Sequence, residues 1–179
     1  MSTTTETPRT SGAENSPQAV TDTSLAIENI VKNYGDLLFD LCESILWSPS
    51  AARAAFRSII AEIKKRREAE AFVDYERAWA LHIACDKLRA LSDRHARKLT
   101  PSEQIELDSI EDSSGRIKKF DSFFHRLSLE DQLLMLLKDK YGIPMAEIAT
   151  ALGSPEGSLK LRRAQALRAM EDWLWGQTQ

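Results

Sequence analysis

The chain has 179 residues, of which 42% are hydrophobic and 28% are charged, and its formal net charge is −3 at pH 7. This length allows one ordinary domain or two small ones. The acidic balance argues against a protein that binds duplex DNA unaided through phosphate contacts alone, so a nucleic-acid role would be local or shared with a larger partner. Seven Gly, six Pro and few alternating β-branched runs favour an all-helical fold.

The two cysteines, Cys42 and Cys85, lie in apolar helical surroundings without a close partner in the sequence. We expect buried free thiols in a reducing cytoplasm rather than a disulfide. No segment approaches the roughly 18 consecutive apolar residues of a membrane span, and the N-terminus has no charged-then-apolar signal pattern. The sequence therefore predicts a cytoplasmic protein with no membrane insertion.

Residues 1–23 are rich in Ser, Thr, Pro and Glu and contain almost no large apolar side chain. Such a segment cannot bury enough surface to offset its chain entropy, which predicts a disordered tail. Ser24 can cap a first helix that runs to about Trp47. The apolar residues of this helix recur at three- and four-residue spacing; they are Ile30, Tyr34, Leu37, Leu38, Leu41 and Ile45.

Two further amphipathic helices follow with short connections, and residues 24–91 are therefore expected to form a compact helical bundle. Ser48 and Pro49 mark the start of the second helix, which ends in the basic run 64–67. Its buried side is predicted to hold Ala52, Phe56, Ile59, Ile60 and Ile63. The third helix is predicted over about 71–91, with an apolar stripe of Phe72, Tyr75, Trp79, Ile83 and Leu88.

Residues 92–119 are polar and charged, and we interpret them as an interdomain linker with helical pieces. A second domain is expected over 120–179, where Phe120, Phe123 and Phe124 start its core. Ser128 can cap the first helix of this domain, and Asp131 three residues later favours the helix N-terminus.

The last part of the chain has the element order of a helix-turn-helix. A short helix over 145–152 is followed by Gly153, which ends it, by Ser154 as a cap and by Pro155 at the first position of the final helix. One side of the final helix is expected to be exposed, with Ser158, Lys160, Arg162 and Gln165. The other side is expected to be buried, with Leu159, Ala166, Met170 and either Trp173 or Leu174.

Two segments resemble the small two-domain bacterial sigma factors of the extracytoplasmic-function (ECF) group. The stronger match, 145–170, reads MAEIATALGSPEGSLKLRRAQALRAM and is similar to that family's helix-turn-helix. Its matching positions are Glu147, Ile148, Ala149, Gly157, Ser158, Leu159, Lys160, Arg162 and Ala166. The weaker match, 78–91, reads AWALHIACDKLRAL and is similar to the family's W-L-x-x-I-A-x-N segment through Trp79, Ile83, Ala84 and Asp86.

The resemblance implies a protein that binds core RNA polymerase, gives it promoter specificity and is held by an anti-sigma factor. Residues 24–91 would be the polymerase-binding domain that traps a melted promoter base, and 120–179 would read upstream promoter DNA. The DNA-binding residues would be Ser158, Lys160, Arg162, Arg163, Gln165, Arg66 and Arg67. The core-polymerase-binding residues would be Arg53, Phe56 and Arg57.

The chain departs from the family pattern in three ways, which involve four positions. Arg53 and Arg57 stand where acidic or amide side chains are usual, Arg163 stands on the apolar stripe where a buried Leu is usual, and Leu161 replaces a small polar residue on the DNA side. A sigma-like decoy that binds an anti-sigma factor would show the same pattern. A stand-alone helix-turn-helix regulator with a dimerising N-terminal half is a further alternative.

Several residues also have a plain structural interpretation. The cations of the final helix could be a solvated face, the run 64–67 an ordinary basic helix end, and the aromatics Phe72, Tyr75 and Trp79 core residues rather than a platform for a flipped base. His82, His95 and His125 do not combine with the cysteines into a zinc-binding set. We expect no cofactor and no enzyme, because the sequence contains no phosphate loop, nucleophile elbow or paired catalytic carboxylates.

Overall fold

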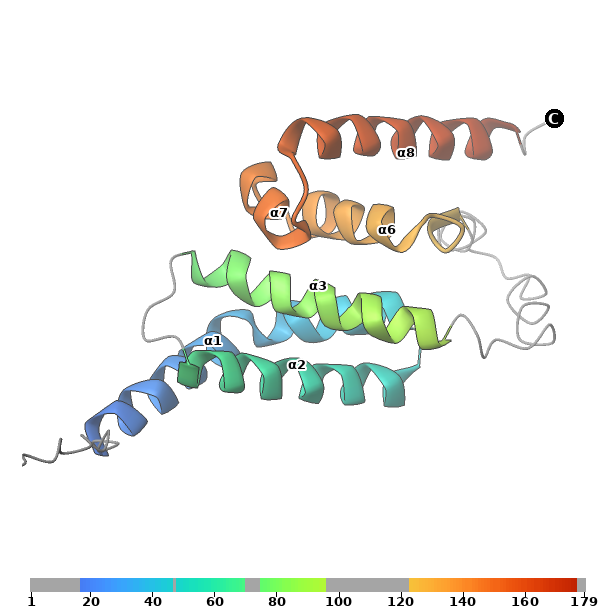
Figure 1. The fold of residues 1–179 in the computed structure, drawn as a ribbon. Coiled ribbons are helices and arrows are strands. Elements are labelled where there is room, and N and C mark those ends of the chain that lie inside the picture. The colour runs from blue at the N-terminus through green and yellow to red at the C-terminus, as the bar shows by residue number, and fades with distance from the viewer. Residues whose placement is uncertain (1–16, 47, 70–74, 96–122, 177–179) are drawn as a thin grey trace, which may run out of the picture.

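The computed structural model describes residues 17–46, 48–69, 75–95 and 123–176. All regular elements in these ranges are helices, which confirms the all-helical prediction. They are α1 (Pro17–Leu46), α2 (Pro49–Ala69), α3 (Glu76–His95), α6 (Leu129–Met135), the π-helical η1 (Leu136–Lys140), α7 (Met145–Leu152) and α8 (Glu156–Gly176). In Figure 1, α1, α2 and α3 lie together, α6 and α7 cover α3, and α8 lies on the far side of α6 and α7.

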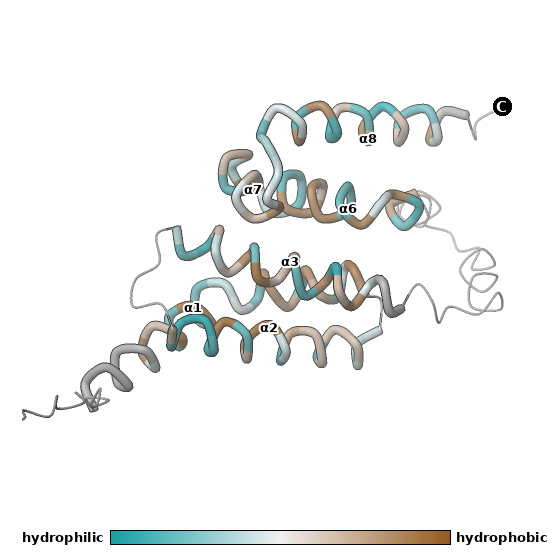
Figure 2. The backbone as a smooth tube through the Cα atoms, viewed as in Figure 1, coloured by the Kyte–Doolittle hydropathy of each residue, from teal (hydrophilic) through white to brown (hydrophobic). Residues whose placement is uncertain are grey.

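The first three helices bury the apolar stripes that the sequence predicts. The predicted stripe residues that are buried in the structure are Ile30, Leu38, Leu41, Ile45, Ala52, Ile59, Ile63, Ile83 and Leu88. Figure 2 shows hydrophobic and hydrophilic residues alternating along these helices. The predicted start at Ser24 is wrong, since α1 begins at Pro17. A proline is well suited to the first turn of a helix, because its missing N–H has no intrahelical acceptor there.

The start of α3 differs from the prediction. The helix begins at Glu76, and Phe72 lies outside the described residues. Tyr75 precedes the helix with a φ of 55° and is 80% exposed, so its placement in the apolar stripe is wrong. The carbonyl of Tyr75 accepts a hydrogen bond from the N–H of Trp79 at 3.0 Å. Tyr75 thus takes part in the first turn of α3 although it precedes the helix. Trp79 itself is half-buried against the core.

Helix α3 continues to His95, beyond the predicted end near residue 91. No Gly or Pro interrupts the chain between these two positions, so nothing local stops the helix there. The rest of the predicted linker, 96–119, and Phe120 lie outside the described residues. Phe123 and Phe124 are buried, as predicted for the start of the C-terminal core.

A π-helical turn shapes the C-terminal half. Ser128 caps α6, since its Oγ accepts the N–H of Asp131 at 3.2 Å, as predicted. In the following segment the N–H of Tyr141 donates to the carbonyl of Leu136, five residues earlier, at 3.1 Å. Such a turn shifts the register of the residues that follow it. Gly142, with a φ of 65°, then ends the segment before α7.

Buried residues from the two halves of the chain form one continuous cluster. Helix α3 supplies the contact, because α7 packs along it and α6 lies beside it. Polar contacts surround the apolar ones: Arg89 of α3 binds Glu130 of α6, and the hydroxyl of Tyr141 donates to Asp40 of α1. Within the described ranges, no helix is long and apolar enough to span a membrane.

Candidate nucleic-acid interface

Helices α7 and α8 are joined by a tight turn of three residues, 153–155. Gly153 takes a left-handed φ of 64°, which a residue with a side chain adopts only at a cost. Its N–H donates to the carbonyl of Thr150 at 3.3 Å, and the N–H of Ser154 donates to Ala149 at 3.1 Å. These bonds satisfy the last carbonyls of α7 and fix the direction in which α8 leaves it.

One side of α8 is held in the core. Leu159 and Ala166 are buried, Met170 packs against the core, and the ring of Trp173 lies 5.8 Å from that of Phe123. The predicted buried side is therefore confirmed, with Trp173 rather than the exposed Leu174 as its last member. Because the inner side is fixed in this way, the opposite side of α8 is turned to solvent.

The outer side of α8 holds three of the predicted contact residues, Ser158, Lys160 and Gln165, all exposed. The Nζ of Lys160 lies 2.6 Å from the carboxylate of Glu156 in the preceding turn. Leu161, 62% exposed, lies near the middle of this side. Arg168 is exposed on the same side and is not among the predicted contact residues, although its spacing of seven residues from Leu161 indicates this position.

Arg162 and Arg163 are turned to the protein instead. Arg162 donates from Nε to Asp131 Oδ1 at 2.9 Å and from Nη2 to the hydroxyl of Ser128 at 3.3 Å. Arg163 donates from Nε to both carboxylate oxygens of Asp139 at 3.1 Å. The hydrogen bond to Asp139 raises the pKa of Arg163. The two arginines thus bind α8 to α6 and η1, and Arg163 is half-buried in an ion pair on the stripe between Leu159 and Ala166.

Arg66 and Arg67, the two predicted DNA contacts on α2, are also partly buried. Arg66 donates to Glu62 at 3.0 Å, and Lys87 of α3 donates to the same carboxylate at 3.0 Å. These two hydrogen bonds lower the pKa of Glu62 to about 2. Arg67 is half-buried, and its Nη1 is buried without a hydrogen-bond partner in the described part of the chain.

The three predicted polymerase-binding residues are separated by the fold. The ring of Phe56 packs against Phe39 at 5.5 Å with an interplanar angle of 81°, so it belongs to the N-terminal core. Arg53 and Arg57 lie one turn apart and are both exposed. The two arginines therefore lie together on the surface, whereas Phe56 points into the core and is not part of the same surface.

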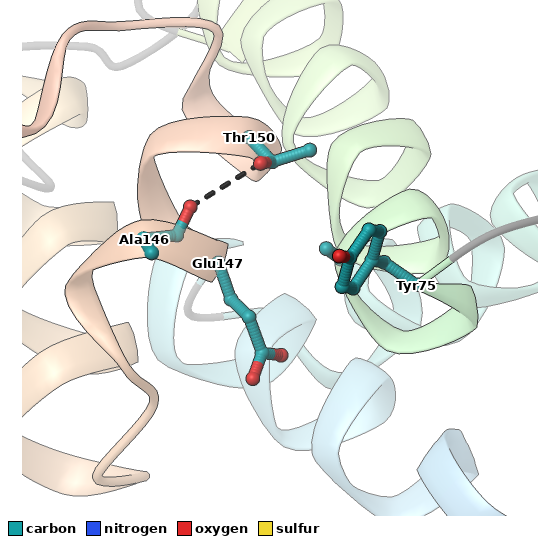
Figure 3. Close-up of a pocket in the computed structure, with 5 residues that line it drawn as sticks. Tyr75, Ala146, Glu147 and Thr150 are labelled. Atoms are coloured by element: carbon teal, nitrogen blue, oxygen red, sulfur yellow. Dashed lines mark hydrogen bonds between the residues drawn. The ribbon is translucent and has the colours of Figure 1, made fainter.

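A pocket of about 320 Å³ lies between α3 and α7. Figure 3 shows Tyr75 on one side of it and Ala146, Glu147 and Thr150 on the other. The carboxylate of Glu147 is bound to Arg77 of α3, and the hydroxyl of Thr150 donates to Ala146 within its own helix. The polar side chains on the α7 side of the pocket are therefore engaged by protein partners.

The cysteines are free and buried, as predicted. Burial raises the pKa of Cys42 and of Cys85 to about 12, so neither thiol is poised to react. His82 donates from Nδ1 to the carbonyl of Ala151 at 3.0 Å. Among the residues that the structure describes, no group of three or more His, Cys, Asp or Glu side chains is placed to hold a metal ion.

Comparison of the sequence with models of known protein families gives no match, and comparison with curated proteins gives none either.

Proposed function

We propose that the chain is a divergent sigma factor of the ECF type, which binds core RNA polymerase and directs it to promoters. In this proposal 24–91 forms the polymerase-binding domain, and 120–179 forms a helix-turn-helix domain whose α8 enters the major groove. In this proposal the protein acts in the cytoplasm, and its partners there are core RNA polymerase and an anti-sigma factor.

One observation carries the proposal: the left-handed Gly153 joins α7 to α8 in a three-residue turn, and α8 keeps one side exposed while the other is buried. A helix held in this way can enter the major groove with its first turns. Ser158, Lys160, Gln165 and Arg168 would make the contacts from that exposed side. The mixed charge of α8 is compatible with promoter binding because polymerase would supply most phosphate contacts.

A different observation favours a second candidate, a sigma-like decoy that binds an anti-sigma factor. Arg162 and Arg163 are engaged by Asp131 and Asp139, and Leu161 lies exposed in the middle of the outer side of α8. An exposed apolar residue surrounded by small and polar ones suits a protein interface better than a DNA groove.

Binding measurements separate these candidates. We expect the purified protein to bind core RNA polymerase, and the Lys160→Ala/Arg168→Ala variant to keep this binding while losing retention of promoter DNA in the complex. Lys32→Ala, which removes an exposed cation of α1, is the control. No polymerase binding together with binding to an anti-sigma factor would favour the decoy. A dimer that shifts duplex DNA without polymerase would favour a stand-alone regulator.

A further inference from the structure

The outer side of α2 carries four exposed cations: Arg53, Arg57, Lys64 and Lys65. In the part of the chain that the structure describes, none of the four has a hydrogen-bond or ion-pair partner. The opposite side of the helix is buried through Ala52, Ala55, Ile59 and Ile63. The row of cations is therefore held toward solvent by the packing of the helix that carries it.

The cations form an extended row. Arg53, Arg57 and Lys64 fall on one line of the helix surface at positions i, i+4 and i+11, and Lys65 lies beside it. At a rise of about 1.5 Å per residue the row extends over about 18 Å. Ala54, Ser58 and Ala61 are the exposed residues between its members. Their small side chains leave room for a close approach to the row.

The cations of α8 other than the exposed Arg168 differ from this row. Lys160, Arg162 and Arg163 each lie in an ion pair with a carboxylate of the chain. Figure 1 places α2 and α8 on opposite sides of the molecule, and α2 packs against α1 and α3 only through its inner side. In a chain of net charge −3, the outer side of α2 is thus a separate region of positive charge. Glu68, at its C-terminal end, is the acidic residue exposed on this side.

The surroundings of the row indicate the kind of partner. The large hydrophobic side chains that are exposed in the described ranges lie outside α2. A protein interface is centred on apolar or aromatic anchors, an amphipathic membrane-binding helix inserts apolar side chains, and a single-stranded nucleic acid stacks on aromatic rings. A rigid row of cations separated by small residues instead suits the regular phosphate backbone of a duplex.

The geometry points to the outer side of α2 as a sequence-independent contact for the phosphates of duplex DNA. The resemblance to sigma factors implied that Arg53 and Arg57 bind polymerase. Here they bind a nucleic acid instead, together with Lys64 and Lys65. The phosphate contact stands independently of the proposed function, and only the choice of DNA over RNA rests on it.

The test measures the affinity of the full chain for a random-sequence DNA duplex by fluorescence anisotropy over a series of salt concentrations. We expect Arg53→Gln/Arg57→Gln to weaken binding about tenfold or more at 0.1 M salt and to reduce the slope of log K against log salt by about 2, since each phosphate contact contributes about 0.9. Lys32→Gln/Arg126→Gln removes the same charge from exposed positions elsewhere and should leave the slope nearly unchanged. Circular dichroism checks that both variants fold.

Equal losses of DNA affinity in the two double variants would overturn the inference, because the losses would then depend on net charge alone. Absence of salt-dependent binding by the unmodified chain would overturn it as well, as would loss of polymerase binding in place of DNA binding in Arg53→Gln/Arg57→Gln. Tighter binding to a duplex RNA of the same length would contradict the choice of DNA. Failure of promoter-specific transcription with the α2 effect intact would reject the proposed function and leave the phosphate contact standing.

Discussion

Arg77 of α3 binds Glu147 of α7 through two hydrogen bonds, from Nε to Oε2 at 2.7 Å and from Nη2 to Oε1 at 2.6 Å. Glu147 is one of the residues on which the resemblance to sigma factors rests, and here its carboxylate ties the first helix of the proposed helix-turn-helix to the N-terminal half of the chain. The hydrogen bond from Arg77 lowers the pKa of Glu147. This pair therefore connects the proposed helix-turn-helix to α3, the helix that carries the weaker of the two resemblances.

Breaking the Arg77–Glu147 pair should destabilise the protein modestly. Both side chains are partly exposed, at 39% and 25%, so solvent screens the charges. We expect Glu147→Ala to lower the free energy of unfolding by about 1 kcal/mol. A double-mutant cycle with Arg77→Ala, measured by urea unfolding, checks the pairwise part of this loss. Fully additive effects of the two substitutions would show that the pair contributes nothing.

Substitution of Arg89 should cost more. Its guanidinium donates to both oxygens of Glu130, to Asp86 and to the carbonyl of Leu152, which joins three helices. The hydrogen bonds to Glu130 raise the pKa of Arg89, so it stays charged throughout the accessible pH range. We expect Arg89→Met to lower the free energy of unfolding by about 2 kcal/mol. A loss no larger than that of Arg77→Met would contradict this order.

His125 should make the protein less stable as the pH falls. Burial lowers its pKa from the ordinary value of 6.5 to about 4, so between these values the unfolded chain binds a proton that the folded chain excludes. Stability should therefore decrease as the pH falls from 6.5 to about 4. His125→Phe, which keeps a ring beside Phe124, should flatten this dependence. Urea midpoints measured across the range check it, and parallel curves for the two proteins would rule it out.

The cations of α8 should divide into two groups. Arg162→Ala removes the contacts to Asp131 and Ser128, and we expect it to lower the free energy of unfolding by about 1 kcal/mol. Lys160→Ala and Arg168→Ala should leave unfolding unchanged and each lower promoter affinity of the polymerase complex by about 1–3 kcal/mol. Chemical unfolding and promoter binding of the same three variants measure both effects. Normal stability of Arg162→Ala would mean that its ion pair contributes nothing.

The helices and their buried sides could be predicted from the sequence because both depend on spacing within one element. Leu38, Ile59 and Leu159 fall on the apolar stripe of their helices, and all three are buried. The helix ends were less predictable. Helix α1 starts at Pro17 and α3 ends at His95. Neither end could be predicted, because no apolar residue that the core would need marks it.

The charge pairs could not be predicted in the same way. Arg162 and Asp131 are 31 positions apart, and Arg77 and Glu147 are 70 apart, so no local pattern connects them. The sequence identifies Arg162 as a cation on the final helix, but only the packing of α8 against α6 decides that it turns toward Asp131. The same packing leaves Arg168 exposed, and the row on α2 is apparent only once its neighbours are known to be small and its cations unpaired.

Run-off transcription with core RNA polymerase on fragments of the source genome tests the proposed function most directly. We expect a discrete transcript that depends on the protein, that is lost with Lys160→Ala/Arg168→Ala and that is kept with Lys32→Ala. Polymerase that produces no discrete transcript with the folded protein, or the same transcripts with and without it, would contradict the proposal.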